Sequence, residues 1–101
     1  MTKRVRIDDE AESDLAGSAA RYEREREGLG IRFVEAVEAA LERIGSHPSI
    51  GGPAPGVPEA VGARHVVVAG FPFSLVYIDL GLELRVVAVA HAKREPGYWM
   101  K

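Results

Sequence analysis

The chain opens with polar and apolar residues in alternation, the pattern of a β-strand. Val5 and Ile7 fall on one side of this segment. Arg4 and Arg6 fall on the other side. The alternation predicts a short first strand that buries its apolar side and exposes its arginines.

A helical pattern follows this strand. Asp9 precedes Glu12 by three residues, a spacing at which each side chain can satisfy a free backbone N–H of a new helix. Apolar residues then recur every three or four positions, at Ala11, Leu15, Ala19 and Tyr22. We expect the first helix to start at this capping box and to end at Gly28 and Gly30.

The second helix has the clearest pattern in the chain. Its apolar stripe has helical spacing and consists of Phe33, Val34, Val37, Ala40, Leu41 and Ile44. Gly45 can adopt the left-handed conformation that closes many helices, and Pro48 cannot continue a helix. We therefore predict that the second helix is capped by Gly45.

Residues 46–62 interrupt the regular pattern. They contain four prolines and four glycines, a composition that disfavours helix and strand alike. We expect a packed but irregular loop. A loop of this length in a compact domain commonly carries function or is locally disordered.

Three strands are predicted after this loop, at residues 64–69, 73–79 and 83–90, because these segments are rich in Val, Ile, Leu and aromatic residues. Their short connections predict an antiparallel meander. The whole chain, residues 1–101, is then one α+β domain with the order β-α-α-β-β-β. Two N-terminal helices should pack on one face of a small, mainly antiparallel sheet and leave the other face partly open.

Side-chain parity assigns polar residues of the last strand to that open face. By this parity Arg85 and His91 lie on the side opposite Leu84, Val86 and Ala88. We therefore expect Arg85 and His91 to share the open face, where a functional surface would lie.

Composition narrows the classes of function. The chain has 101 residues and no cysteine, which excludes disulfides and cysteine-based zinc sites. Its three histidines, His47, His65 and His91, lack the spacing of metal ligands, so we expect no metal and no cofactor. The lack of a long apolar run predicts no membrane partner and a cytoplasmic location. A formal net charge of −2 argues against a strong binder of nucleic acid.

Several short strings lie along nearly the whole chain. They are Ala11-x-x-Asp14-Leu15, Tyr22-Glu23, Gly30-x-x-Phe33, Leu41-x-x-Ile44 followed by Pro48, then Arg64, Phe71-Pro72-Phe73, Tyr77 and the closing run 87–99. Together they resemble the RelE/ParE family of bacterial toxins, the toxin halves of type II toxin–antitoxin pairs. The resemblance implies a small αβ domain that a cognate antitoxin protein wraps and neutralises, in a toxin–antitoxin hetero-oligomer.

The resemblance implies two alternative targets. Members similar to ParE are not enzymes and poison DNA gyrase, whereas members similar to RelE enter the ribosome and cut mRNA. The RNA-cutting members tend to carry a basic residue before the turn between the second and third strands, where this chain has Val68-Ala69-Gly70. This difference and the net negative charge favour a ParE-like inhibitor of DNA gyrase over a ribosome-dependent endoribonuclease. An inactive antitoxin-binding module is a third alternative.

Candidate site residues gather near the end of the last strand. If the chain is a nuclease, His91, Arg94 and Tyr98 are its candidate catalytic residues, as base, phosphate clamp and acid. The alternative for His91 is an imidazole with no chemical role. The candidate residues for binding the target or the antitoxin are Arg64, Arg85, Lys93, Arg94, Tyr98 and Trp99. The alternative for Trp99 is an intramolecular role, in which it docks against the helices and seals the edge of the core.

Overall fold

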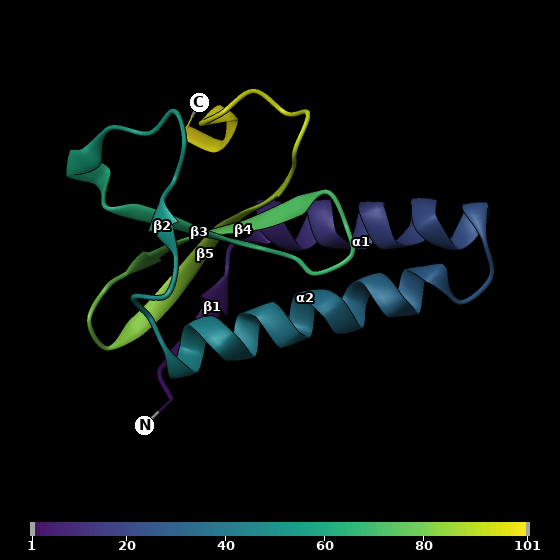
Figure 1. Ribbon diagram of the computed structural model, residues 1–101, viewed down its shortest axis with the longest axis horizontal. Coiled ribbons are helices and arrows are strands. Elements are labelled where there is room, and N and C mark those ends of the chain that lie inside the picture. Colours follow the sequence, from purple (N-terminus) through teal and green to yellow (C-terminus); the bar gives the residue numbers. More distant parts are fainter. Residues whose placement is uncertain (1, 101) are drawn as a thin grey trace.

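Two helices lie along one face of a five-stranded sheet in the computed structural model, which describes residues 2–100 (Figure 1). The helices are α1 (Asp9–Glu25) and α2 (Leu29–Ser46). The strands are β1 (Arg4–Ile7), β2 (Gly52–Pro53), β3 (Ala63–Val67), β4 (Phe73–Asp79) and β5 (Glu83–His91). Two 3₁₀ turns complete the fold, η1 (Glu59–Val61) and η2 (Tyr98–Met100). The predicted α+β order is confirmed, with β2 as an additional short strand.

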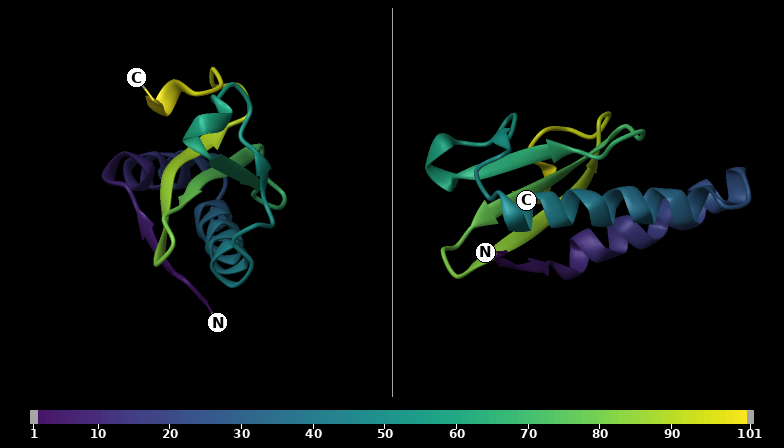
Figure 2. Two further views of the ribbon diagram at one scale, coloured as in Figure 1. Left: turned by 90° about the vertical axis from the view of Figure 1, so that its left-hand side faces the viewer. Right: turned by 60° about the horizontal axis from the view of Figure 1, so that its bottom comes forward.

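The sheet has the strand order β1-β5-β4-β3-β2. β1 pairs with β5 in parallel, and all other neighbours pair antiparallel, which confirms the predicted meander. β5 therefore lies inside the sheet, between the first strand and β4. Figure 2 shows both helices on one side of the sheet and the C-terminal segment on the other.

The main core fills the space between the helices and the sheet. α2 contributes Phe33 and Val37, and β4 contributes Leu75 and Tyr77, all of them fully buried. Four aromatic rings close one end of this core with centroid separations of 4.9–6.2 Å, those of Tyr22, Phe33, Phe71 and Phe73. Tilted and edge-on aromatic contacts add to the free energy gained by burial.

A β-bulge interrupts the pairing of β4 with β5. Val76 pairs with Ala88, but the next residue of β4, Tyr77, pairs with Val86. Val87 is therefore an extra residue in β5. A bulge of this kind reverses the alternation of side chains between the two faces beyond it.

The bulge separates two residues that were expected to share a face. Arg85 lies before it and pairs with Ile78, whose side chain packs on the face away from the helices. His91 lies after it, and its ring contacts the ring of Phe73 in the helix-side core at a centroid distance of 5.0 Å. The prediction that Arg85 and His91 share the open face is wrong, because one inserted residue reversed the parity.

The start of α1 differs from the predicted capping box. The residue that precedes the helix is Asp8, and its side chain makes no capping hydrogen bond. Its carboxylate instead binds the guanidinium of Arg85 at 2.8 Å. Asp9 is the first residue of the helix rather than its cap. The tertiary ion pair has replaced the local capping interaction.

Glu23 of α1 caps the start of α2. Its two carboxylate oxygens accept hydrogen bonds from the backbone N–H groups of Gly28 and Gly30, each at 2.9 Å. The negative charge of this carboxylate also stabilises α2, because it lies beside the positive end of the helix dipole. α1 ends at Glu25, three residues before the predicted Gly28, and Gly28 instead precedes α2 with a φ of 86°. Gly30 instead belongs to α2, where a Cβ atom would lie 2.6 Å from the carbonyl oxygen of Ala19.

Gly45 does not adopt the predicted left-handed cap. α2 continues to Ser46, and the Gly45 carbonyl accepts a hydrogen bond from the Lys3 N–H at 2.9 Å. A Cβ atom on Gly45 would lie 3.1 Å from the Thr2 methyl group and 3.3 Å from the Lys3 carbonyl oxygen. This glycine therefore allows the N-terminal segment to approach the end of α2 closely.

The loop predicted to be irregular is partly regular. Gly52 and Pro53 form β2 on the outer side of β3, and η1 follows. The Tyr77 hydroxyl anchors the start of this loop, because it donates to the Pro48 carbonyl at 2.7 Å and accepts from the Gly51 N–H at 3.0 Å. One buried hydroxyl thus ties the loop to the main core.

The substitution Tyr77→Phe should destabilise the protein by about 1–3 kcal/mol, because it leaves buried backbone groups without a hydrogen-bond partner. Urea unfolding followed by circular dichroism measures this change. The control is Tyr22→Phe, which removes the hydroxyl of a half-buried residue that makes no hydrogen bond within residues 2–100 and should change the unfolding free energy by less than about 0.5 kcal/mol. Equal effects of the two substitutions would contradict the anchoring role.

Candidate functional site

The C-terminal tail, residues 92–100, turns back over the face of the sheet that the helices leave uncovered (Figure 1). It starts with a hydrogen bond from the Ala92 N–H to the Pro72 carbonyl at 2.8 Å. Further along, Pro96 packs so closely against Gly56 of the loop that a Cβ atom on Gly56 would overlap it. The open face expected from the sequence is therefore partly covered by the tail and the loop.

Tyr98 connects the tail to the first helix. Its hydroxyl donates a hydrogen bond to the carboxylate of Asp14 at 3.1 Å. Burial, followed by the negative charge and hydrogen bond of Asp14, raises the pKa of Tyr98 to about 12. The guanidinium carbon of Arg94 lies 3.7 Å from the centroid of the Tyr98 ring, a cation–π geometry. Asp14, Tyr98 and Arg94 thus form one connected cluster.

Trp99 docks within the molecule, although not against the helices as expected. Together with Tyr98 it packs on a second, smaller apolar cluster on the tail side of the sheet. The buried members of this cluster are Ala54, Ala63, Val76, Val87 and Ala88. The intramolecular interpretation of Trp99 is thus correct, but the surface that it covers is the sheet.

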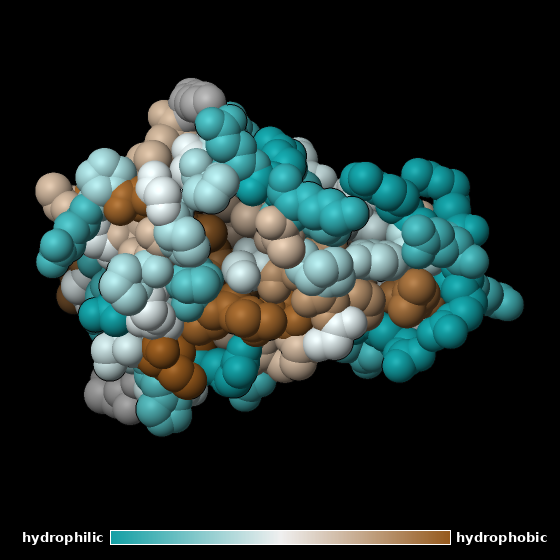
Figure 3. Space-filling model, turned by 45° about the horizontal axis from the view of Figure 1, so that its top comes forward, coloured by the Kyte–Doolittle hydropathy of each residue, from teal (hydrophilic) through white to brown (hydrophobic). Residues whose placement is uncertain are grey.

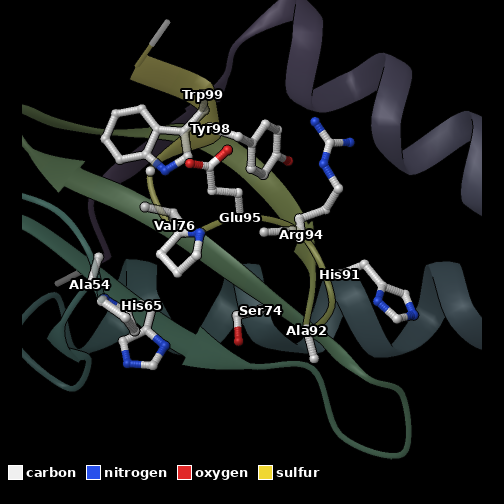
Figure 4. Close-up of a pocket in the computed structure, with 14 residues that line it drawn as sticks. Ala54, His65, Ser74, Val76, His91, Ala92, Arg94, Glu95, Tyr98 and Trp99 are labelled. Atoms are coloured by element: carbon white, nitrogen blue, oxygen red, sulfur yellow. The ribbon is translucent and has the colours of Figure 1, made fainter.

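The three candidate nuclease residues line one cavity beneath the tail, but their functional groups point in different directions. The His91 Nδ1 accepts a hydrogen bond from the Lys93 N–H at 3.0 Å, and its ring packs on Phe73. In Figure 4 the His91 ring points away from Tyr98 and from the guanidinium of Arg94. The Tyr98 hydroxyl is directed at Asp14. A general base and a general acid must reach the same reacting group, which this arrangement does not provide.

Two of the candidate binding residues have internal partners. Arg64 donates to the Gly51 carbonyl at 2.6 Å and so holds the loop. Arg85 forms a two-pronged ion pair with Asp8, and the hydrogen bonds from this guanidinium hold the pKa of the Asp8 carboxyl below its usual value. The structure therefore separates Arg64 and Arg85 from the tail cluster.

Lys93, Arg94, Tyr98 and Trp99 remain together in the tail. Lys93 and Arg94 are exposed, and the two aromatic residues are half-buried. Exposed cations beside partly buried aromatic rings are typical of protein-binding surfaces. Among the predicted site residues, these four form the contiguous group.

Asp14 is the member of this cluster that the sequence analysis missed as a site residue. It stands three residues after the buried Ala11, so it lies at the margin of the buried face of α1. A half-buried carboxylate at such a position needs a polar partner. That requirement was visible in the sequence, but its partner lies 84 residues further along the chain.

Large apolar side chains are exposed at several places on the surface. The most exposed are Leu82, Ile31, Val67, Ile50, Leu80 and Met100. On the face seen in Figure 3, apolar residues form a band across the middle, and hydrophilic residues dominate the end of the helical pair. A contiguous band of apolar surface is a common feature of binding surfaces, whereas singly exposed apolar residues are not.

Residues 2–100 contain no helix that is long and apolar enough to cross a membrane. Within the same residues, no three His, Asp or Glu side chains are grouped so that they could hold a metal ion.

The fold is similar to that of a solved chain from the chromosomal ParDE TA system of P. aeruginosa, with a TM-score of 0.75 and 17% sequence identity. The likeness covers 89% of this chain and 96% of that chain, so the two chains share the same α+β fold. No curated protein matches the sequence. The family model of the ParE toxin of type II toxin–antitoxin systems, parDE, matches residues 5–96. The chain therefore belongs to the ParE toxin family, and its partner is an antitoxin.

The substitution Asp14→Asn should lower the pKa of Tyr98. The negative charge of Asp14 disfavours the phenolate, so its removal makes ionisation easier and moves the titration to lower pH. Ultraviolet absorbance against pH measures the phenolate, and Tyr98→Phe identifies the component that belongs to Tyr98. An unchanged midpoint in Asp14→Asn would show that the two side chains are not in contact in solution.

Proposed function

We propose that this toxin acts in the cytoplasm by inhibiting DNA gyrase, and that its cognate antitoxin neutralises it in a toxin–antitoxin hetero-oligomer. The match of residues 5–96 to the ParE toxin model carries this proposal. Gyrase inhibition is the activity that the resemblance to ParE implies. It needs a binding surface rather than a catalytic centre.

The geometry of the tail supports gyrase over mRNA as the target. His91 packs against Phe73, whereas Tyr98 is bound to Asp14. Cleavage of RNA also requires strong binding of phosphates, which proteins achieve mainly with Lys and Arg. The acidic residues Asp9, Glu10 and Asp14 instead lie beside Arg94 along the margin of the tail. This mixed charge favours a protein target.

An apolar groove between α1 and α2 is the surface that we propose for the antitoxin. Ala20, Ile31 and Val34 contribute its apolar lining, and Glu35 and Glu38 lie at its edge. Ile31 is 66% exposed in the isolated chain. An amphipathic helix with an apolar stripe and basic flanks would complement both the shape and the charge of this groove.

Expression of the toxin without its antitoxin should stop the growth of a bacterial host and switch on a DNA-damage reporter, because a poisoned gyrase leaves broken DNA. Culture density and reporter fluorescence measure the two effects, and co-expression of the antitoxin is the control. Growth arrest with a silent reporter would contradict gyrase as the target and would favour mRNA cleavage.

The substitution Ile31→Asp should weaken binding of the antitoxin about 10-fold or more, because it places an unpaired charge in the apolar groove. Toxicity should persist, since Ile31 lies away from the tail. Leu82→Asp is the matched control, because Leu82 is 94% exposed and does not line the groove. Titration calorimetry with the purified antitoxin measures the difference. Equal affinities of the two variants would place the antitoxin elsewhere.

A further inference from the structure

A cavity of about 160 Å³ lies beneath the tail, between Trp99 and the sheet (Figure 4). Its volume is close to that of an engineered protein cavity of about 150 Å³ that binds benzene. The cavity is partly open to solvent. It can therefore take an aromatic ring from outside without unfolding of the tail.

Small side chains create this cavity. Ala90 of β5 and Ser74 of β4 are register partners, and both line its sheet side. Ala54 from the loop and Gly97 from the tail extend the same lining. A larger residue at any of these positions would fill space that Trp99 leaves open.

The tail is held above the cavity from two sides. The hydrogen bond from Tyr98 to Asp14 fixes it to α1, and the close contact of Pro96 with Gly56 fixes it to the loop. Both attachments keep Trp99 in place on its apolar cluster, so the space beside it stays open. The cavity is thus a preformed feature, as most small-molecule sites in proteins are.

The cavity has polar groups on two sides: Glu95 lies on the same side as Trp99, and two polar side chains lie on the sheet across from it (Figure 4). Ser74 and His65 line the cavity, and in Figure 4 they lie on the side opposite the indole ring. Neither the Ser74 hydroxyl nor the His65 ring makes a hydrogen bond within residues 2–100. These groups can therefore bind a hydroxyl group that enters the cavity, while Trp99 and Val76 contact the ring that carries it.

We propose that this cavity is a binding pocket for a phenol ring, supplied by a tyrosine side chain of the antitoxin. Apolar walls and an indole ring suit the flat face of the phenol, and Ser74 with His65 suits its hydroxyl. The identity of the partner rests on the proposed function, but the pocket itself does not.

Binding of p-cresol, the side-chain analogue of tyrosine, tests the pocket in the purified chain. Trp99 is the only tryptophan, so its fluorescence reports directly on the cavity when excitation is confined to tryptophan. Saturable change in this fluorescence is the expected result. A linear, unsaturable change in the folded chain would overturn the proposal.

Ala90→Leu should abolish saturable binding, because the added carbon atoms fill the cavity. Ala39→Leu is the matched control, since Ala39 is exposed on α2 and outside the cavity. It should bind p-cresol as the parent chain does. Circular dichroism verifies that both variants are folded. Undiminished binding by folded Ala90→Leu would place the ligand elsewhere and contradict the proposal.

Two comparisons test the hydroxyl and the source of the ring. Ser74→Ala should weaken binding of p-cresol about fivefold, the effect of one hydrogen bond, and leave binding of toluene unchanged.

The toxin–antitoxin complex should not bind p-cresol, because the antitoxin's tyrosine fills the pocket. Equal binding of p-cresol by the complex and the free chain would overturn the antitoxin as the source. Growth arrest is scored separately, so failure of this pocket does not imply failure of gyrase inhibition.

Discussion

The pairing of β4 with β5, with its bulge at Val87, is the constraint on which the rest of the structure depends. Before the bulge, Leu84 and Val86 face the helices, and after it Val89 does so. Val87 and Ala88 face the opposite side. β5 is therefore apolar on both faces, and a sheet with an apolar strand of this kind needs cover on both sides.

Short segments of the chain cover both faces of the sheet. Two helices cover one face, whereas the tail and the loop cover part of the other. A segment as short as the tail stays on the sheet only if other contacts hold it there. The hydrogen bond from Tyr98 to Asp14 is one of these contacts. The same attachment holds Arg94 over the Tyr98 ring, so a contact that stabilises the fold also organises the exposed surface of the tail. Packing and recognition share the same residues.

Periodicity predicted most of the fold, because helices and strands reflect spacing within short segments. The apolar stripe of α2 and the three strands of the meander were predicted correctly, and the domain order with them. Errors arose where a distant residue decided the outcome. The Asp8 side chain does not cap its helix, because it binds Arg85. Gly45 does not cap α2 either, and its missing side chain leaves room for the N-terminal segment.

The sequence predicted which tail residues form the candidate site, but it did not predict how they are arranged. The site contains three residues that are near one another both in the sequence and in the fold, Arg94, Tyr98 and Trp99. Nothing in the sequence near His91 reveals the bulge that moved its ring to the helix side. Asp14 could be linked to Tyr98 only after the tail had been placed. Long-range pairing, rather than local pattern, determined each of these results.

The most direct test of the account is a supercoiling assay with purified DNA gyrase and the purified toxin. The account predicts that the toxin stops supercoiling and causes cleaved DNA to accumulate, and that the antitoxin reverses both effects when added first. Gyrase that supercoils DNA normally in the presence of excess folded toxin, while mRNA is cut on ribosomes in a translation extract, would contradict it.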